Sequence, residues 1–442
     1  MSADEVHLVL SNVLEASELY QLRRIYLPNG KIGGKPQWLD PIRVPTAADA
    51  KCEVCGKPMA FVVQIYAPNQ KFPESAFHRY LYVFVCRNGE CSQPNKSANL
   101  KVLRSQLPRK NSFFGFDKPL DPNLDGEIED PFHDPEKFAH LCNTCGLKAT
   151  SKCAKCSQVR GLSSFVFGVL QTWYCSRDHQ IIDWTSGHRQ KCGKTVEERA
   201  EELQTDDPKM FAVSELSTVP PENSFLFREY GIKTAVDYGS NVLANEEFES
   251  DDEIEDEEAN ESKDFEQKQH EELKKLVAEM QIKNQNEDIK DADLLESLDE
   301  RVDHAYKRFC CLNQRRPSQL IRYALGAQPL SATDYSPVPS LHDNLTNPKL
   351  MVPNCERCGS KRVFELQLMP HLLTLMEVDA PGASVDWATV FIYTCERSCD
   401  LNNAGFTFEF AWKQDFVVAD NEANEPISKK DEQDLDACAV DS

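Results

Sequence analysis

Two stretches of this 442-residue chain, "CEVCGKPMAFVVQIY" at residues 52–66 and "CERCGSKRVFELQLM" at residues 355–369, follow one pattern. Each begins with a C-x2-C pair and continues with β-forming residues, which alternate in the second copy. Three further residues recur at matching positions, namely Gly56 and Gly359, Phe61 and Phe364, and Gln64 and Gln367. The pattern predicts a duplicated unit, and its alternative is a chance similarity between two zinc ribbons.

Both copies also end alike. The aromatic-rich strands "YLYVFVC" and "TVFIYTC" reach a cysteine, and another cysteine follows after four or three residues. Zinc prefers four such ligands, and a C-x2-C pair supplies two of them from one turn. Redox chemistry would need a thioredoxin-like βαβ context, which these segments lack. We therefore expect one zinc ion in each copy, held by Cys52, Cys55, Cys86 and Cys91 and by Cys355, Cys358, Cys395 and Cys399.

A two-stranded unit is marginally stable alone. Structural zinc contributes roughly 10–16 kcal/mol in finger peptides, against about 5–15 kcal/mol for whole domains, so the metal decides whether such units fold. The expected fold class is β-rich α+β, in which two zinc-knuckle β units form a bilobed domain. The expected boundaries are 1–125 for the N-terminal half and 301–420 for the C-terminal half, with a disordered tail at 421–442.

A third cysteine cluster lies between the copies. The stretch "WYCSRDHQIIDWTSGHRQKC", residues 173–192, contains two cysteines and two histidines and follows a C-x2-C-x7-C-x2-C run. These eight ligands are enough for two further zinc ions, about four per chain in total. The spacing resembles the MYND zinc finger, whose ligand pairs interleave, and we place this finger at 138–195. The resemblance implies one site at Cys142, Cys145, Cys175 and His179 and another at Cys153, Cys156, His188 and Cys192.

One part of this finger departs from the pattern. The segment between Cys156 and Cys175 is longer than MYND fingers usually have. Residues 159–171 are either a true loop or an insertion from the gene model.

Residues 196–300 are expected to form an acidic linker. Residues 246–258, "EEFESDDEIEDEE", carry acids and no base, which is typical of disorder. A helix follows, with Leu273, Leu276, Val277 and Met280 on one face. The acidic run is interpreted either as an attraction for a basic client or as a solvated spacer.

The charge and the cysteine content narrow the classes of partner and the cellular compartment that we expect. The chain has 49 basic and 72 acidic residues and a net charge of −23, which argues against general nucleic-acid binding and favours a basic partner. The start "MSADEVHLVL" is not expected to be a signal peptide. The 17 cysteines are therefore expected to stay reduced, and Cys310 and Cys311 are expected to be buried apolar residues. The uncharged run at 161–176 is too short for a membrane span. We expect a soluble protein of the cytoplasm and nucleus.

Catalysis is not expected. The predicted zinc sites are closed, with no coordination position left for water. The chain has no Gly-rich cofactor loop, and His78 and His371 lie isolated in apolar strings. The short basic-aromatic segment "QLPRKNSFF", residues 106–114, is a candidate for nucleic-acid binding. Because the chain as a whole is strongly acidic, direct nucleic-acid binding is not favoured.

Longer strings identify a family resemblance. The chain resembles the programmed cell death protein 2 family through "GGKPQWLDP", "AFHRYLYVFVC" and "SQLPRKNSFF", then the MYND string, then "QLIRY", "FELQLMPHLL", "DWATVFIYTCERSC" and "FEFAWKQDF". The resemblance implies a dedicated chaperone for the basic ribosomal protein S-two in small ribosomal subunit production, with a role in cell proliferation. Aromatic residues near "FHRYLYVF" and "NSFFGF", among them Phe77, Tyr80, Phe113 and Phe114, are either client contacts or core.

A MYND-mediated transcriptional or corepressor adaptor in the nucleus is the alternative function. MYND fingers elsewhere bind Pro-rich peptides, and by that resemblance Gln180 and Trp184 would line the groove. The alternative for Trp184 is packing over the zinc loops.

Overall fold

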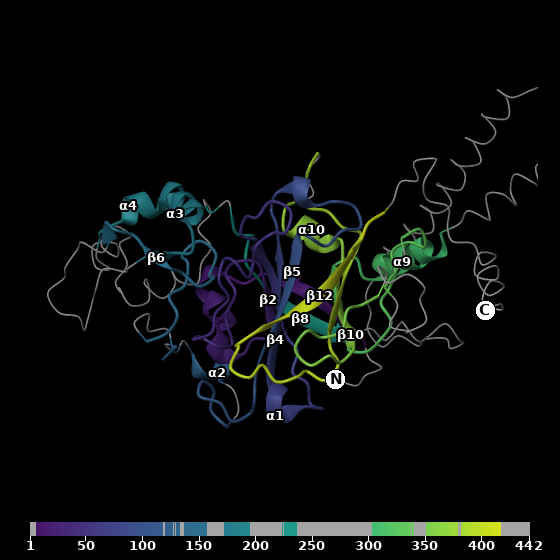
Figure 1. Cartoon of the computed structure of the whole chain (residues 1–442), viewed down its shortest axis with the longest axis horizontal. Helices are drawn as coiled ribbons and strands as arrows, with labels where there is room; N and C mark the ends of the chain where they lie inside the picture. The colour runs from purple at the N-terminus through teal and green to yellow at the C-terminus, as the bar shows by residue number, and fades with distance from the viewer. Residues whose placement is uncertain are drawn as a thin grey trace, which may run out of the picture. The chain divides into compact units, whose positions relative to one another are not determined.

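Ten strands form a closed barrel in the computed structural model of this protein (Figure 1). The structure describes residues 6–117, 120–126, 128, 130–132, 137–156, 172–194, 223, 225–236, 303–336, 338–339, 351–378 and 382–416. The strand order is β1-β8-β2-β3-β4-β5-β12-β11-β10-β9. The strands are β1 His7–Asn12, β2 Gly30–Ile32, β3 Ala60–Tyr66, β4 His78–Val85, β5 Leu100–Leu107, β8 Tyr230–Val236, β9 Gln319–Tyr323, β10 Arg362–Leu368, β11 Thr389–Cys395 and β12 Thr407–Gln414.

Short helices and one small sheet surround these strands. The two-stranded sheet pairs β6 (Ser151–Lys152) with β7 (Trp173–Tyr174). None of the helices among the described residues is long and apolar enough to span a membrane. The helices are η1 Ala16–Leu22, η2 Arg24–Tyr26, α1 Pro73–Ala76, η3 Gly89–Cys91, α2 Pro122–Asp125, α3 Arg177–Asp183, η5 Trp184–His188, α4 Arg189–Lys191, α9 His304–Arg315 and α10 His371–Leu375.

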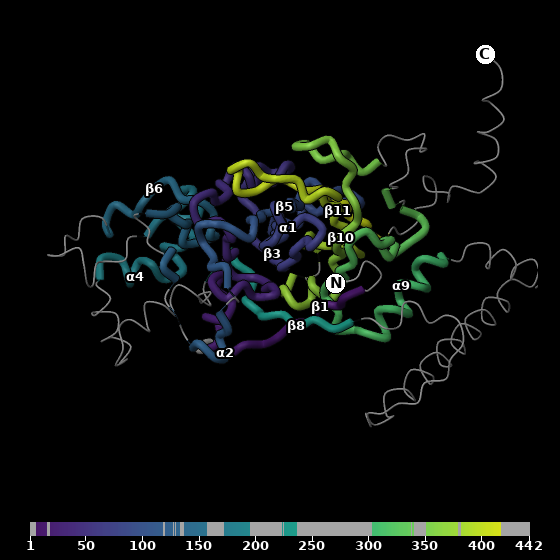
Figure 2. Tube along the Cα trace, turned by 90° about the horizontal axis from the view of Figure 1, so that it is seen from below, coloured from purple at the N-terminus to yellow at the C-terminus, as the bar shows by residue number. Residues whose placement is uncertain are grey.

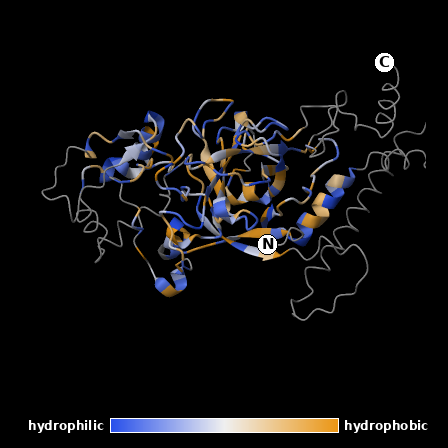
Figure 3. Cartoon of the chain, turned by 60° about the horizontal axis from the view of Figure 1, so that its bottom comes forward, coloured by the Kyte–Doolittle hydropathy of each residue, from blue (hydrophilic) through white to orange (hydrophobic). Residues whose placement is uncertain are grey.

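The central strand β4 is buried on both faces. Leu81 and Val83 belong to one apolar cluster, to which nearly every barrel strand contributes. The alternate residues Tyr80 and Tyr82 belong to a second cluster, which includes the N-terminal and MYND cysteines. Because side chains alternate along a strand, β4 separates the barrel interior from the metal-binding region. The central strands are coloured mainly hydrophobic in Figure 3.

The two sequence copies occupy equivalent places in the barrel. Each forms an antiparallel hairpin, β3–β4 in the first copy and β10–β11 in the second. The register shifts by one residue after Phe61 in the first hairpin and after Phe364 in the second, so both carry a β-bulge at the same position of the repeat. The strand order then runs β2-β3-β4-β5 and, in reverse, β12-β11-β10-β9, so the copies meet where β5 pairs with β12.

When β8, which precedes the range expected for the C-terminal half, is counted as the first strand of that half, the first strands of the two halves are exchanged. The N-terminal strand β1 pairs with β9 of the C-terminal half, whereas β8 pairs with β2 of the N-terminal half. β1 and β8 also pair with each other and thereby close the barrel, as Figure 2 shows for the purple β1 and the teal β8. Both copies therefore share one barrel, where a bilobed pair was expected.

The exchange also corrects the expected linker. Residues 230–236 lie inside the range 196–300, yet they form a barrel strand because "YGIKTAV" pairs along the whole of β1. The acidic run, the helix expected after it, and the tail 421–442 lie outside the described residues.

Candidate metal centres

Within the described part of the chain, cysteine and histidine side chains gather into four groups of four. Within each group the ligand atoms lie within 4.8 Å of one another. The membership is the one expected from the sequence, including the interleaving of the MYND pairs. The groups are Cys52, Cys55, Cys86 and Cys91; Cys142, Cys145, Cys175 and His179; Cys153, Cys156, His188 and Cys192; and Cys355, Cys358, Cys395 and Cys399.

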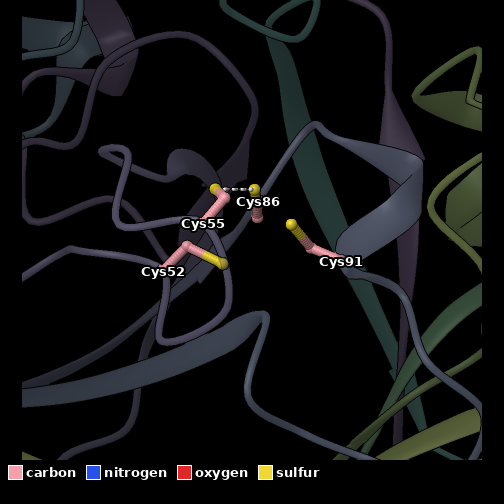
Figure 4. A group of neighbouring side chains, drawn as sticks. All are labelled: Cys52, Cys55, Cys86 and Cys91. Atoms are coloured by element: carbon pink, nitrogen blue, oxygen red, sulfur yellow. Dashed lines mark hydrogen bonds between the residues drawn. The ribbon is translucent and has the colours of Figure 1, made fainter.

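The sulfur separations in the outer groups fit a tetrahedral metal ion. In the N-terminal group the Sγ atoms of Cys55 and Cys86 are 3.6 Å apart, and all four thiols converge in Figure 4. In the C-terminal group Cys358 Sγ lies 3.6 Å from Cys395 Sγ. Tetrahedral zinc with bonds of about 2.3 Å places sulfur atoms roughly 3.8 Å apart, whereas a disulfide needs about 2.05 Å. The thiols are therefore spaced as metal ligands.

The two MYND groups have the same spacing but use different histidine nitrogens. Cys145 Sγ lies 3.6 Å from Cys175 Sγ, which in turn lies 3.1 Å from Nδ1 of His179. In the other group Cys156 Sγ lies 3.5 Å from Nε2 of His188. Neutral imidazole can ligate through either nitrogen, so both groups offer three thiols and one ring nitrogen.

A glycine directly after the second cysteine shapes three of the C-x2-C turns. Gly56, Gly146 and Gly359 have φ near +73°, +73° and +72°, a region that favours glycine. In each turn the glycine N–H donates to the carbonyl of the first cysteine at 2.8–3.0 Å. This turn folds both cysteines of a pair towards one point.

Hydrogen bonds within the finger hold α3 against the first C-x2-C turn. Ser176 caps α3 by accepting from the backbone N–H of His179 at 3.2 Å, and Thr144 Oγ1 donates to the carbonyl of His179 at 2.7 Å. The buried Asp183 accepts from the Tyr174 hydroxyl at 2.6 Å and from Asn143 Nδ2 at 2.8 Å. Asp183 was not predicted from the sequence, although its position one helical turn after His179 was an available signal.

The electrostatics of the groups call for a cation. Burial raises the pKa of the Cys192 and Cys395 thiols to about 12 and that of Cys91 to about 11. Burial also opposes ionisation of Cys358, but hydrogen bonds from Ser360 lower its pKa to about 6. Neighbouring thiols cannot all ionise in one buried site unless a divalent cation compensates them, so these donor sets fit zinc.

The remaining candidate residues of the finger lie beside the metal groups but are not part of them. Gln180 and Trp184 are half-buried on successive turns, and the Trp184 ring meets the His188 ring edge-on at 5.8 Å. The prediction that Cys310 and Cys311 are buried was wrong: Cys310 is half-buried and Cys311 is exposed on α9. Polar neighbours in "YKRFCCLNQRR" dominate that helix, and only Phe309 is buried.

His78 and the aromatic candidates divide between core and surface. His78 is buried, its Nδ1 lies 3.0 Å from the Tyr66 hydroxyl, and burial lowers its pKa to about 4. Tyr80 is fully buried, so it belongs to the core. Phe113 and Phe114 are partly buried against the second apolar cluster.

Comparisons with known proteins cover most of the chain. Residues 9–121 match the programmed cell death protein 2 N-terminal domain, residues 142–192 the MYND finger, and residues 303–418 the programmed cell death protein 2 C-terminal putative domain. No solved structure matches the chain.

Three relatives illustrate the range of similarity. Programmed cell death protein 2 of Bos taurus is 31% identical over 92% of this chain and 96% of its own length. Programmed cell death protein 2-like of Homo sapiens is 25% identical over 84% of this chain and 85% of its own length. Probable 20S rRNA accumulation protein 4 of Schizosaccharomyces pombe is 34% identical over 19% of this chain and 20% of its own length. The chain belongs to the programmed cell death protein 2 family.

Proposed function

We propose that this protein is a non-enzymatic zinc-binding chaperone for a basic ribosomal protein of the small subunit, ribosomal protein S-two, and acts in production of that subunit. The observation that carries the proposal is a net charge of −23 on a scaffold with four closed ligand sets. Such a charge attracts an arginine-rich client over long range. Closed sites leave no coordination position at which a substrate could react.

A distant similarity supports the ribosomal assignment. The fission-yeast relative is named for accumulation of 20S rRNA. Ribosomal RNA and small-subunit proteins are assembled together, so a chaperone of such a protein belongs to the same process. We extend the proposal to a cytoplasmic and nuclear location and to support of cell proliferation.

Zinc is the metal that we propose, with four ions per chain. Tetrahedral sites of four thiolates, or of three thiolates and one imidazole, are the ligand sets of structural zinc. Each of the four groups supplies one full set. Metal analysis of purified full-length protein tests both the identity and the count.

For the client surface we propose the exposed aromatic segment beside α1. Phe116 is 64% exposed, and the Arg109 guanidinium lies 4.1 Å from its ring centroid and 5.1 Å from that of Phe77. A large exposed aromatic side chain held by its neighbours is typical of a protein contact. Affinity capture of the tagged chain identifies its partner. Growing cells are lysed and ribosomes are removed before the capture. We expect a small-subunit ribosomal protein at one copy per chain, and less of it with Phe116→Ala.

Leu124→Ala is the matched control, since this side chain is 80% exposed on α2. Capture without any stoichiometric ribosomal protein would refute the chaperone proposal. If Phe116→Ala and Leu124→Ala lose captured ribosomal protein equally, only the assignment of the client surface is refuted.

The alternative function is a MYND adaptor for Pro-rich peptides. Its support is that Ile181 is 52% exposed between Gln180 and Trp184, so the three side chains offer a partly apolar surface on α3 and the start of η5. The double variant Gln180→Ala/Trp184→Ala separates the two functions. If the double variant still captures the ribosomal protein, the chaperone function is favoured. If it captures neither the ribosomal protein nor Pro-rich partners, the adaptor function is favoured.

We also propose that the two halves are duplicated units. The support is the common C-x2-C-G turn and the bulge that follows Phe61 in one copy and Phe364 in the other.

A further inference from the structure

Two basic side chains on neighbouring strands each cross to the cysteine-bearing segment of the other half. We propose that Arg104 and Lys413 are positioning residues for the opposite metal centre, so that the two outer centres form one interlocked unit. The inference goes beyond the proposed chaperone function and depends on metal being bound by the two outer groups.

Arg104 lies on β5 of the N-terminal half and is fully buried. Its Nη2 donates to Cys399 Sγ at 3.6 Å, and its Nη1 donates to the Cys399 carbonyl at 3.2 Å. Gln106 on the same strand donates through Nε2 to the carbonyl of Ser398 at 2.9 Å. A side chain of the first half thus hydrogen-bonds a metal-ligand candidate of the second.

Lys413 lies on β12 of the C-terminal half and is 1% exposed. Its Nζ donates to Ser92 Oγ at 3.1 Å, directly after Cys91, and to the Asp386 carbonyl at 2.9 Å. Its backbone N–H donates to Ser97 Oγ at 2.8 Å. The Ser92 contact crosses in the opposite direction, from the second half to the residue that follows the closing pair of the first half.

The strand order makes the crossing reciprocal. β5 and β12 are the last strands of their halves, and they pair antiparallel at the seam between the copies. β5 therefore contacts the segment that carries Cys399, and β12 contacts the residue that follows Cys91.

The net negative charge of a four-thiolate zinc site explains what the contacts of Arg104 with Cys399 contribute. Four thiolates around Zn²⁺ carry a net charge of −2, and a buried guanidinium beside one sulfur offsets part of it. Arg104 is also held in place, because its Nε donates to Glu409 Oε1 at 2.6 Å while Arg362 Nε donates to Oε2 at 2.9 Å. Partners of metal ligands of this kind typically contribute about 10–100-fold to metal affinity.

Zinc-loaded full-length variants test the inference. Hydrogen exchange at residues 395–401 and 86–92 reports on each closing pair, and a chromogenic chelator follows zinc release. Arg104→Gln should raise exchange at 395–401 and speed the release of one zinc about 10-fold or more. Lys413→Gln should raise exchange at 86–92 instead. Lys233→Gln, which removes an exposed charge on β8, should change neither.

The proposal is overturned if each substitution raises hydrogen exchange at the closing pair of its own half. It is also overturned if exchange at residues 395–401 and 86–92 rises equally, or if neither segment responds. Exchange in the MYND finger, read from the same spectra, distinguishes a local change from general unfolding. If Arg104→Gln does not fold, Arg104→Lys keeps the charge but loses the planar fork of donors and should act in the same direction. If neither Arg104 variant folds, Lys413→Gln decides.

The readout does not involve the client. A negative result therefore leaves the chaperone proposal standing, whereas wild-type protein without metal refutes the zinc proposal before any variant is compared.

Discussion

Arg79 and Glu365 form a doubly hydrogen-bonded ion pair between the two halves of the barrel. The distances are 2.5 Å from Nη1 to Oε1 and 2.7 Å from Nη2 to Oε2, and both side chains are buried. Arg79 lies on β4, and Glu365 lies at the bulge of β10. The Tyr323 hydroxyl also donates to Glu365 at 3.0 Å, so the carboxylate is held from several strands.

Loss of one partner should therefore destabilise the whole barrel. Glu365→Gln leaves a buried guanidinium without its counter-charge, and we expect a loss of about 3–5 kcal/mol in the free energy of unfolding. Urea unfolding of zinc-loaded protein measures it. The double variant Arg79→Met/Glu365→Gln should lose less than the two single variants summed, because no isolated charge remains.

The pair of Lys101 and Glu53, 3.3 Å apart, is the control, because it is more exposed: 20% of the lysine side chain and 63% of the glutamate side chain are accessible. Lys101→Gln should cost less than about 1 kcal/mol. If the substitutions at the two pairs lowered the free energy of unfolding equally, burial would not explain the larger cost expected at Arg79 and Glu365.

Removal of the metal should unfold the cysteine-bearing segments. Each structural zinc contributes roughly 10–16 kcal/mol in isolated finger peptides, comparable to the stability of a domain. We expect Cys142→Ser to lower the zinc content by one ion and to loosen the MYND finger, as measured by metal analysis and hydrogen exchange. Cys311→Ser should change neither, because Cys311 is exposed and lies outside the four groups. A native fold after complete chelation would contradict the proposed zinc sites.

Two glycines with the same backbone conformation should tolerate alanine very differently. Gly359 has φ +72°, and a Cβ added there would meet no atom within 4 Å, so Gly359→Ala should cost about 1–2 kcal/mol from backbone strain alone. At Gly33, with φ +66°, a Cβ would lie 1.9 Å from the Arg228 carbonyl oxygen. Gly33→Ala should therefore cost more than about 4 kcal/mol. Thermal unfolding ranks the two, and the reverse order would refute the packing of Gly33.

Acidification should weaken the fold through His78. Its pKa is about 4 in the folded protein, against about 6.5 in the unfolded chain, so protonation favours unfolding. Its stabilising contribution is complete above pH 6.5 and is lost as the pH falls towards 4, by about 2 kcal/mol between pH 7 and pH 5.

The measurement compares urea unfolding of wild type and His78→Asn at pH 7 and pH 5, which separates this histidine from acid release of metal. A wild-type slope no steeper than that of the variant would show that His78 titrates normally.

Local features of this protein were predictable, and long-range pairings were not. Ligand spacing is local, so the pairs Cys52/Cys55 and Cys355/Cys358 already mark their sites in the sequence. The similarity between the hairpins β3–β4 and β10–β11 was visible in the sequence for the same reason. By contrast, β1 and β8 are short, and their partners lie hundreds of residues away, so nothing near them in the chain indicates pairing.

The surface environment of α9 was equally hard to predict. Cys310 and Cys311 lie in a helix that buries only Phe309, and the choice of buried face depends on the barrel beneath it. The interleaved MYND ligands were expected through a family resemblance, and spacing alone left their pairing open.

The exchange of first strands has a consequence for synthesis of the chain. His7 pairs with Val236 and with Tyr323, so β1 leaves the ribosome long before either neighbour exists. At roughly 5–20 residues per second the wait lasts tens of seconds. During translation this hydrophobic strand has no native partner, and the barrel closes only when the last strands emerge.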